Sequence, residues 1–279
     1  MNFVFAFVFG IIEGITEWLP ISSTGHLILA QAFMNFKNLS VDFWDVFEVV
    51  IQLGAILAVV CLYFKKLWPV NYEKKDKKIT WNYDILNLWI KIIISCLPAI
   101  LIVVFKIDDL ADKYFYNPTS IAIMLILVGI IFIVIERMNK NKKDFRVNHI
   151  KDITYKDAII IGLFQMIAAV FPGTSRSGAT IIGALLLGIS RVASAEYTFY
   201  LAIPAMFGAS ALKILKFGLA FSGAEWAVLI IGTLIAFIVS VFVIKFLMDY
   251  IKKHNFEVFG WYRIIVGLIV LALIGFKVI

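Results

Sequence analysis

The stretch GIIEGITEWLPISSTGH, residues 10–26, is too polar at its centre for an ordinary membrane span and too apolar at its ends for a loop. A second stretch of the same kind, GLFQMIAAVFPGTSRSGAT, covers residues 162–180. Each contains a proline, Pro20 or Pro172, and a proline ring in a helix interior removes a hydrogen bond. Each stretch therefore predicts two apolar helices joined at a polar break.

The remainder of the chain predicts an all-α integral membrane protein. Of its 279 residues, 62% are hydrophobic and 16% are charged, against about 45–50% and about 25% in soluble domains. A bilayer-spanning helix needs about 20 apolar residues, and a helix satisfies its own backbone in lipid. The six expected transmembrane helices are Trp44–Phe64, Ile85–Phe105, Pro118–Ile135, Ala193–Leu215, Ala224–Ile244 and Phe259–Phe276.

Lysine and arginine gather in three connections, residues 65–78, 137–156 and 245–253. Because cytoplasmic loops collect these residues, we place the three connections inside and both chain termini outside. Each polar stretch must then return to the side that it entered. We therefore expect two re-entrant helix-turn-helix hairpins that enter from opposite sides, with their freed backbone groups covered by protein or facing a water-filled cavity.

A shift of 152 residues superimposes the first stretch on the second. The matched pairs are Gly10 with Gly162, Glu13 with Gln165, Pro20 with Pro172, Ser22 with Thr174 and Ser23 with Ser175. Each half then has one hairpin and three spans, and an odd number of spans inverts one copy relative to the other. We expect a single polytopic membrane domain, 1–279, with inverted repeats of about 1–137 and 153–279. Such folds place a site where two broken helices meet near the midplane.

The first break carries acids and hydroxyls. Glu13 and Glu17 are four residues apart and share one helix face, and a charge at this depth costs at least ~2.5–3.5 kcal/mol. We expect them to face a polar cavity, share a proton or hold a cation; a structural hydrogen bond or salt bridge is the alternative. The hydroxyls of Ser22, Ser23 and Thr24 suit a helix start, which binds anions, although plain capping explains one of them.

His26 follows Ser23 by three residues on the same side of the expected helix. A serine nucleophile with a histidine base is therefore geometrically available. The alternative is a histidine that is merely packed and hydrogen bonded.

The second break combines glycines and hydroxyls with an arginine. Gly173 and Gly178 permit close approach of a ligand to the backbone. Arg176 is costly in a membrane unless it is paired, and its planar fork suits phosphate or carboxylate; a structural ion pair with Glu13 or Glu17 is the alternative. The hydroxyls that can line an oxyanion belong to Thr174, Ser175, Ser177 and Thr180. Together the two breaks offer an anion clamp, a nucleophile or positioned water, and a base or metal, as phosphoryl chemistry requires.

These residues resemble the two signature motifs of the bacterial undecaprenyl-diphosphate phosphatase, or bacitracin-resistance, family. The likeness covers nearly the whole chain and shows no departure at a motif position. The stretches that carry it are Glu13–His26, Pro172–Thr180, Phe47–Gly54, Ser190-Arg191 and Glu196.

The resemblance implies a hydrolase that converts undecaprenyl diphosphate to undecaprenyl phosphate and inorganic phosphate, and so recycles the lipid carrier of peptidoglycan synthesis. It implies a divalent cation, Mg²⁺ or Ca²⁺, and a polyprenyl diphosphate substrate for which bacitracin competes. It also implies the bacterial cytoplasmic membrane, with the site open to the outer side. A homodimer is compatible with the sequence, and no nucleic-acid partner is expected.

Carried over by position, the family's catalytic residues are Glu13, Glu17, Ser23, His26 and Arg176. The phosphate pocket is expected to include Ser22, Thr24, Gln52, Gly173, Thr174, Ser175, Ser177, Gly178 and Thr180. Our hypothesis assigns Arg176 to the diphosphate, Ser23 or a water to the attack, and His26 to the role of base or orienter. The two glutamates hold the cation, or one of them is the base. A secondary transporter or lipid flippase is the rival function, because inverted repeats with broken helices are typical of transporters.

Overall fold

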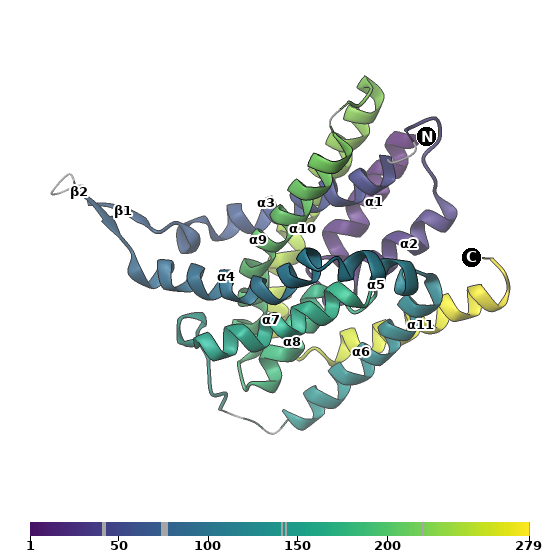
Figure 1. Ribbon diagram of the computed structural model, residues 1–279. Helices are drawn as coiled ribbons and strands as arrows, with labels where there is room; N and C mark the ends of the chain where they lie inside the picture. The colour runs from purple at the N-terminus through teal and green to yellow at the C-terminus, as the bar shows by residue number, and fades with distance from the viewer. Residues whose placement is uncertain (41–42, 74–77, 141, 143, 219, 279) are drawn as a thin grey trace.

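The computed structural model describes residues 1–40, 43–73, 78–140, 142, 144–218 and 220–278, and these are almost entirely helical (Figure 1). Within these ranges, six helices are long and apolar enough to cross a membrane. They are α3 (Phe43–Leu67), α4 (Tyr83–Val104), α6 (Pro118–Met138), α9 (Arg191–Phe217), α10 (Gly223–Ile251) and α11 (Glu257–Gly275). Each overlaps one predicted span, so the prediction of a mostly helical protein with six helices that could cross a membrane is confirmed.

The spans begin where the sequence supplies a helix cap. The Asn82 side chain accepts hydrogen bonds from the first backbone N–H groups of α4, and Asn117 caps α6 just before Pro118. In α10, Ser222 and Glu225 form a reciprocal capping box. These side chains satisfy backbone N–H groups that a helix leaves unpaired at its start.

The lateral surface of the spans is apolar. Large exposed side chains include Leu101 on α4, Ile130 on α6, Phe242 on α10 and Leu268 on α11. A soluble protein rarely exposes continuous apolar surface of this kind. This is the surface that lipid tails cover in a membrane.

Two pairs of shorter helices correspond to the predicted broken stretches. The first pair is α1 (Asn2–Thr16) and α2 (Ser23–Phe33), and the second is α7 (Tyr155–Val170) and α8 (Arg176–Leu186). In both pairs the leading helix ends before the proline, as the missing N–H of proline requires. Glu17, Ser22, Thr174 and Ser175 therefore lie between the paired helices, and the next helix starts within the serine-rich run.

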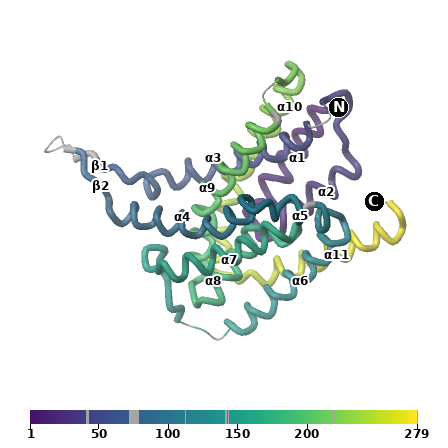
Figure 2. Tube along the Cα trace, in the orientation of Figure 1, coloured from purple at the N-terminus to yellow at the C-terminus, as the bar shows by residue number. Residues whose placement is uncertain are grey.

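The leading helix of each pair packs against a distant span. Helix α1 lies along α10, α7 lies along α4, and α6 packs against α11 (Figure 2). A Cβ added at Gly10 would lie 2.6 Å from the carbonyl oxygen of Gly232, and one added at Gly162 would lie 2.5 Å from that of Ser95. The repeated glycines thus let two helix backbones touch, as small residues do in membrane proteins.

Four short elements were not predicted. Strands β1 (Val70–Glu73) and β2 (Lys78–Trp81) form an antiparallel hairpin in which Val70 pairs with Trp81, and it projects from the left of Figure 1. The amphipathic helix α5 (Ile107–Phe115) and the 3₁₀ turn η1 (Ile150–Asp152) complete the elements. Both termini lie on the opposite side of the view from the hairpin (Figure 1).

Candidate active site

Both breaks turn into the following helix in the same way. Ser22 and Ser175 are N-caps with left-handed φ values of 76° and 70°. Their hydroxyls accept hydrogen bonds from the N–H groups of Gly25, at 3.4 Å, and Gly178, at 3.2 Å. A positive φ is strained for serine, and such strain gathers at functional sites. The caps are 153 residues apart because Pro172 is separated from its cap by two residues and Pro20 by one.

The residues that follow the two caps meet at one carboxylate. The hydroxyl of Ser23 donates to Oε2 of Glu17 at 2.7 Å, and Nη2 of Arg176 donates to Oε1 at 2.9 Å. Ser23 therefore corresponds to Arg176 in the second break. Its expected match with Ser175 is wrong by one residue, because the 152-residue offset holds only as far as the prolines.

The ion pair between Glu17 and Arg176 is the structural pairing that the sequence left as an alternative. Both side chains are largely buried, with 8% and 15% of their surfaces exposed. The N-termini of α2 and α8, which carry partial positive charge, converge on this carboxylate through Ser23 and Arg176. Glu17 thus occupies a position suited to an anion such as phosphate.

The other hydroxyls of the second break hold Arg176 in place. The Ser177 hydroxyl donates to the backbone carbonyl of Glu17 at 3.1 Å, and Arg176 Nη1 donates to the Thr198 carbonyl of α9 at 3.1 Å. The Thr180 hydroxyl donates to the Arg176 carbonyl and lies 2.9 Å from the Thr198 hydroxyl. In this state Ser177 and Thr180 join helices rather than line an open pocket.

Several buried polar atoms at the breaks have no hydrogen-bond partner in the part of the chain that the structure describes. They include both carboxylate oxygens of Glu13, the hydroxyl of Thr174 and Nε of Arg176. Buried polar atoms almost always have a partner, and an exception calls for an explanation such as a ligand, an ion or a water. These atoms are therefore available to bind a ligand, an ion or a water at the site.

A third acid, Glu48 of α3, was not predicted as a site residue. It is buried, it accepts a hydrogen bond from Tyr116 at 3.5 Å, and it acts electrostatically on Glu13, as do Glu17 and Arg176. Its position inside an apolar span was the available signal, because acids there are usually functional.

Glu13 and Glu17 were predicted to hold a divalent cation, whose remaining ligands would be phosphate oxygens of the substrate. Over the described ranges, no three His, Cys, Asp or Glu side chains form a ready-made metal site. Magnesium in phosphate-processing sites is commonly held by one or two carboxylates together with substrate oxygens. Glu13, with both oxygens unpartnered, meets that requirement better than Glu17, whose oxygens already bind Arg176 and Ser23.

His26 does not pair with Ser23. Its Nδ1 lies 2.7 Å from the Ser22 carbonyl oxygen, and its Nε2 lies 2.8 Å from the hydroxyl of Tyr262 in α11. The expected Ser23–His26 pair is absent because the Ser23 hydroxyl points to Glu17 instead.

Arg263, also missed by the sequence reasoning, ties the two breaks together. It is fully buried and donates to the Pro20 carbonyl at 3.1 Å, the Gly173 carbonyl at 2.7 Å and the Thr174 carbonyl at 2.9 Å. The carbonyl of Leu125, on α6, accepts a further, longer bond of 3.4 Å. An arginine inside the last apolar run was the signal for it, since charges at that depth need partners.

The family model for bacitracin resistance protein BacA matches residues 6–269 of the chain. The chain belongs to the BacA family. An undecaprenyl-diphosphatase of Desulfitobacterium hafniense is 59% identical over 266 residues, which cover 95% of this chain and 94% of that one. One from Lachnoclostridium phytofermentans is 60% identical over 265 residues, 94% and 93% of the two chains. One from Enterococcus faecalis is 56% identical over 265 residues, 95% and 94%.

The comparisons confirm the family that the two breaks resemble. With six apolar spans and membership of the BacA family, the chain is a multi-pass membrane protein.

Two residues expected in the phosphate pocket are less closely connected to this site. Across the described ranges, no hydrogen bond or ion pair joins the side chain of Thr24 or Gln52 to the other candidate residues, although Gln52 lies one helical turn after Glu48 on α3.

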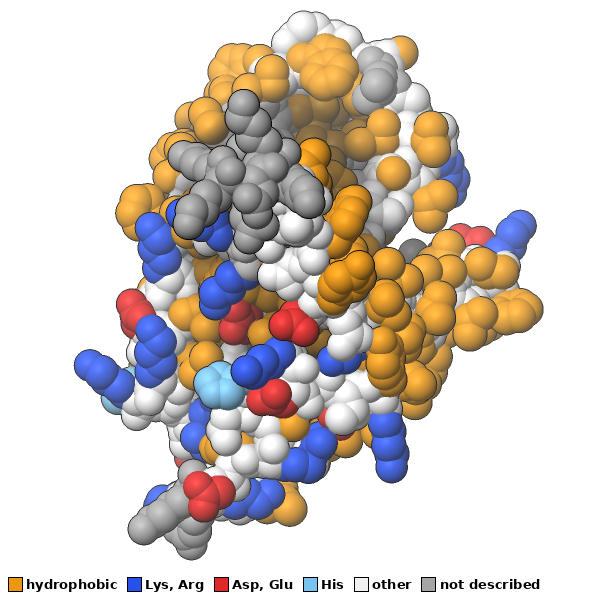
Figure 3. Space-filling view, turned by 90° about the vertical axis from the view of Figure 1, so that its left-hand side faces the viewer, with side chains coloured by type: hydrophobic (Ala, Val, Ile, Leu, Met, Phe, Trp, Pro, Cys, Tyr) orange, Lys and Arg blue, Asp and Glu red, His pale blue; other side chains and the backbone are white. Residues whose placement is uncertain are grey.

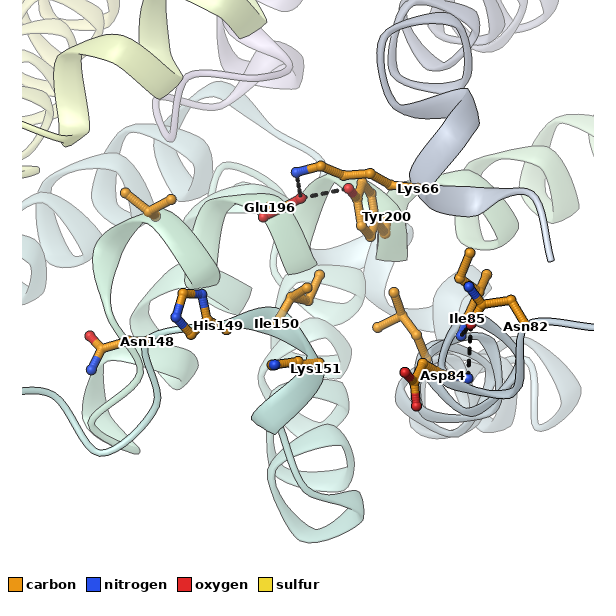
Figure 4. A pocket seen from close by; sticks show the side chains of 12 residues that line it. Lys66, Asn82, Asp84, Ile85, Asn148, His149, Ile150, Lys151, Glu196 and Tyr200 are labelled. Carbon is orange, nitrogen blue, oxygen red and sulfur yellow. Dashed lines mark hydrogen bonds and ion pairs between the residues drawn. The ribbon is translucent and has the colours of Figure 1, made fainter. Parts of the chain in front are cut away.

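Two other positions of the family resemblance lie away from the breaks. Arg191 binds Glu136 through both Nε and Nη2 and so joins α9 to α6. Glu196 accepts hydrogen bonds from Lys66 at 2.8 Å and Tyr200 at 2.7 Å, in a cavity of about 430 Å³ (Figure 4). This cavity opens at the end where charged side chains gather around a hollow (Figure 3), and none of the predicted site residues lines it.

Proposed function

We propose that this chain hydrolyses undecaprenyl diphosphate to undecaprenyl phosphate and inorganic phosphate. The observation that carries the proposal is the shared carboxylate, on which a serine hydroxyl from one break and a guanidinium from the other converge. A hydroxyl aimed at a base, beside a cation and two helix starts, is an arrangement suited to phosphoryl transfer. The relatives in Desulfitobacterium, Lachnoclostridium and Enterococcus carry the name of that activity.

In the first step the Ser23 oxygen attacks the terminal phosphorus. Its proton passes to Oε2 of Glu17, which already accepts its hydrogen bond. The bond between the terminal phosphorus and the bridging oxygen breaks, and its electron pair stays on the bridging oxygen of the departing prenyl phosphate. Of the two bases that the sequence left open, His26 or one of the glutamates, this assignment takes Glu17.

In the second step a water molecule attacks the phosphoserine. The bond between phosphorus and the Ser23 oxygen breaks, and that oxygen recovers the proton held by Glu17. The protons of the water leave with inorganic phosphate. Arg176 would turn from Glu17 toward the transferred group, for which its unpartnered Nε is available.

A divalent cation, Mg²⁺ or Ca²⁺, fits Glu13, because both oxygens of Glu17 already bind Ser23 and Arg176. When bound, the cation would supply positive charge to the phosphate oxygens. The fold holds the Glu13 carboxylate buried beside the first break, with both oxygens free to bind the cation. An unpaired buried carboxylate is costly, so a cation also stabilises the fold there.

The membrane arrangement is part of the proposal: two re-entrant hairpins and inverted repeats within one domain. In the repeat, α1 corresponds to α7 and α4 corresponds to α10. The packing of α1 on α10 therefore has its counterpart in the packing of α7 on α4, which supports the repeat. We place the protein in the cytoplasmic membrane with the site open to the outer side. Removal of undecaprenyl diphosphate, the lipid for which bacitracin competes, would give bacitracin resistance.

Phosphate release by detergent-purified protein tests the proposal. With undecaprenyl diphosphate and Mg²⁺, we expect turnover that falls by at least about 10³-fold in Ser23→Ala and in Arg176→Ala. Matched controls are Ser120→Ala at the start of α6 and Arg137→Ala, an exposed arginine. Near-normal activity of Ser23→Ala would remove the covalent route in favour of direct attack by water.

The rival transporter function predicts a different result. It requires lipid uptake by proteoliposomes without phosphate release in the presence of either cation. The contact between Ser23 and Glu17 favours hydrolysis, because a transport site has no need of a hydroxyl hydrogen-bonded to a base.

A further inference from the structure

Tyr262 and Arg263 are consecutive on α11, and each reaches the first helix pair. Arg263 donates to the Pro20 carbonyl in the break, while the Tyr262 hydroxyl lies 2.8 Å from Nε2 of His26. The rings of Tyr262 and His26 are also stacked, with centroids 5.6 Å apart and planes 7° from parallel. Two independent contacts therefore fix the His26 ring.

The partners of His26 determine where its proton lies. The Ser22 carbonyl can only accept a hydrogen bond, so Nδ1, 2.7 Å from it, carries the proton. In the neutral ring Nε2 is then an acceptor, and the Tyr262 hydroxyl donates to it. Tyr262 thus holds the one ring nitrogen of His26 that could face a ligand.

The pair borders an apolar cavity. A space of about 430 Å³ lies between α1, α2 and α11, and His26 and Tyr262 are among its lining residues. Most of the other lining side chains are aliphatic or aromatic, including Ile12, Ile15, Leu29 and Phe33. A space of this character suits a hydrocarbon chain and not a phosphate.

The cavity lies close to the attacking hydroxyl, because His26, which lines the cavity, and Ser23 are on the same helix, α2. His26 follows Ser23 by three residues, a rise of about 4.5 Å along the helix axis. A diphosphate whose terminal phosphorus lies at Ser23, and whose hydrocarbon lies in the cavity, must place its other phosphate between them. His26 and Tyr262 border that region.

We propose that His26 and Tyr262 form the subsite for the phosphate that stays on the prenyl chain, with Tyr262 as the positioning residue. This subsite rests on the proposed function. A phosphate oxygen would replace Nε2 as acceptor of the Tyr262 hydroxyl. The freed Nε2 would take up a proton from water and donate a hydrogen bond to the same phosphate.

Product inhibition separates this subsite from the site of attack. Farnesyl phosphate carries the retained phosphate and a prenyl chain, whereas inorganic phosphate resembles the group that is transferred. In Tyr262→Phe, which keeps the ring stack, we expect the inhibition constant of farnesyl phosphate to rise at least about tenfold, the effect of one lost hydrogen bond to a charged group. The constant for inorganic phosphate should stay within about twofold.

The matched control is Tyr155→Phe, because the Tyr155 hydroxyl binds Asn87, away from the breaks. Unchanged inhibition by farnesyl phosphate in Tyr262→Phe, or an equal change for both inhibitors, would overturn the proposal. Thermal unfolding of each variant shows whether the fold is intact. His26→Gln repeats the inhibition test on the second member of the pair.

Binding measurements keep this proposal separate from the proposed function. If the wild type released no phosphate, the hydrolytic function would fail. Equilibrium binding of farnesyl phosphate against farnesol would still test the subsite. A preference for the phosphate that Tyr262→Phe loses supports the subsite, and equal binding of the two ligands rejects it.

Discussion

The first break is open on one side, whereas the second is enclosed, although the chain turns through both in the same way. In α2 the buried residues are Ser23, Gly25 and Leu27, while α8 is buried continuously over residues 177–185. Both helices start from a serine cap with a left-handed backbone, so the difference lies in what surrounds them. The second break is enclosed in the core, and we propose that a substrate reaches the site from the side of the first break.

The side chains that follow the caps also differ. The first break presents a small hydroxyl, Ser23, and the second a long cation, Arg176, yet both bind Glu17. One backbone arrangement, used twice, therefore places two different chemical groups on a single carboxylate. In the proposed mechanism, the first break supplies the attacking hydroxyl and the second break supplies the positive charge.

The largest expected effect comes from the carboxylate that joins the breaks. Glu17→Gln keeps the shape of the side chain but removes the proton acceptor and the partner of Arg176, and we expect kcat to fall at least about 10³-fold. Phosphate release measures it, with the more exposed Glu257→Gln as control. Activity within about tenfold of wild type would show that the breaks function without a shared carboxylate.

The second effect tests whether the breaks are held together by Arg263. In Arg263→Gln, the carbonyls of Pro20, Gly173 and Thr174 lose charged donors while they remain buried. We expect the free energy of unfolding in detergent to fall by about 3 kcal/mol. Arg137→Gln, which breaks an exposed ion pair, should cost about 1 kcal/mol or less. Equal losses in both variants would contradict a special role for Arg263.

The third effect concerns the unpaired acid beside the first break. Glu13→Gln should raise the Mg²⁺ concentration for half-maximal activity at least about tenfold, because a ligand is lost. We also expect Mg²⁺ to raise the melting temperature of the wild type and not that of Glu13→Gln. Asp249→Asn, an exposed acid on α10, is the control. An unchanged Mg²⁺ dependence would assign Glu13 a role other than cation binding.

The smallest effect compares the two caps directly. Ser22→Gly and Ser175→Gly each lose a capping hydroxyl but relieve a positive φ. We expect stability changes within about 0.5 kcal/mol. Alanine at either position keeps the strain and loses the cap, and should cost about 1–2 kcal/mol. A glycine effect as large as that of alanine would show that the hydroxyl, and not the backbone conformation, dominates.

Local sequence signals predicted the spans and the two breaks well. Long apolar runs determined the six helices, and Pro20 and Pro172 located the interruptions, because a spanning helix and a proline impose strong constraints over a few residues. The hairpin β1–β2 was missed because its strands are four residues long and lie in a lysine-rich connection.

The connections between the breaks could not be predicted from spacing. The sequence allowed Arg176 to pair with Glu13 or Glu17, and nothing local distinguished the two. Tyr262 is 236 residues from His26, and Arg263 is 243 residues from Pro20, so their contacts depend on how α11 packs. The register of the breaks was wrong by one residue, because one extra residue between a proline and its cap leaves the composition and the hydrophobic pattern of the stretch almost the same.

The position of Arg263 also limits how the molecule can move. A rocking of one half against the other that separated Pro20 from Gly173 would leave a buried guanidinium without its acceptors, at a cost of several kcal/mol. The two broken ends therefore behave as one rigid joint during turnover. The substrate then has to reach the site through motion of side chains and of α2, around a centre that does not move. This is what a hydrolase needs, whereas a transporter has to open its site to each side of the membrane in turn.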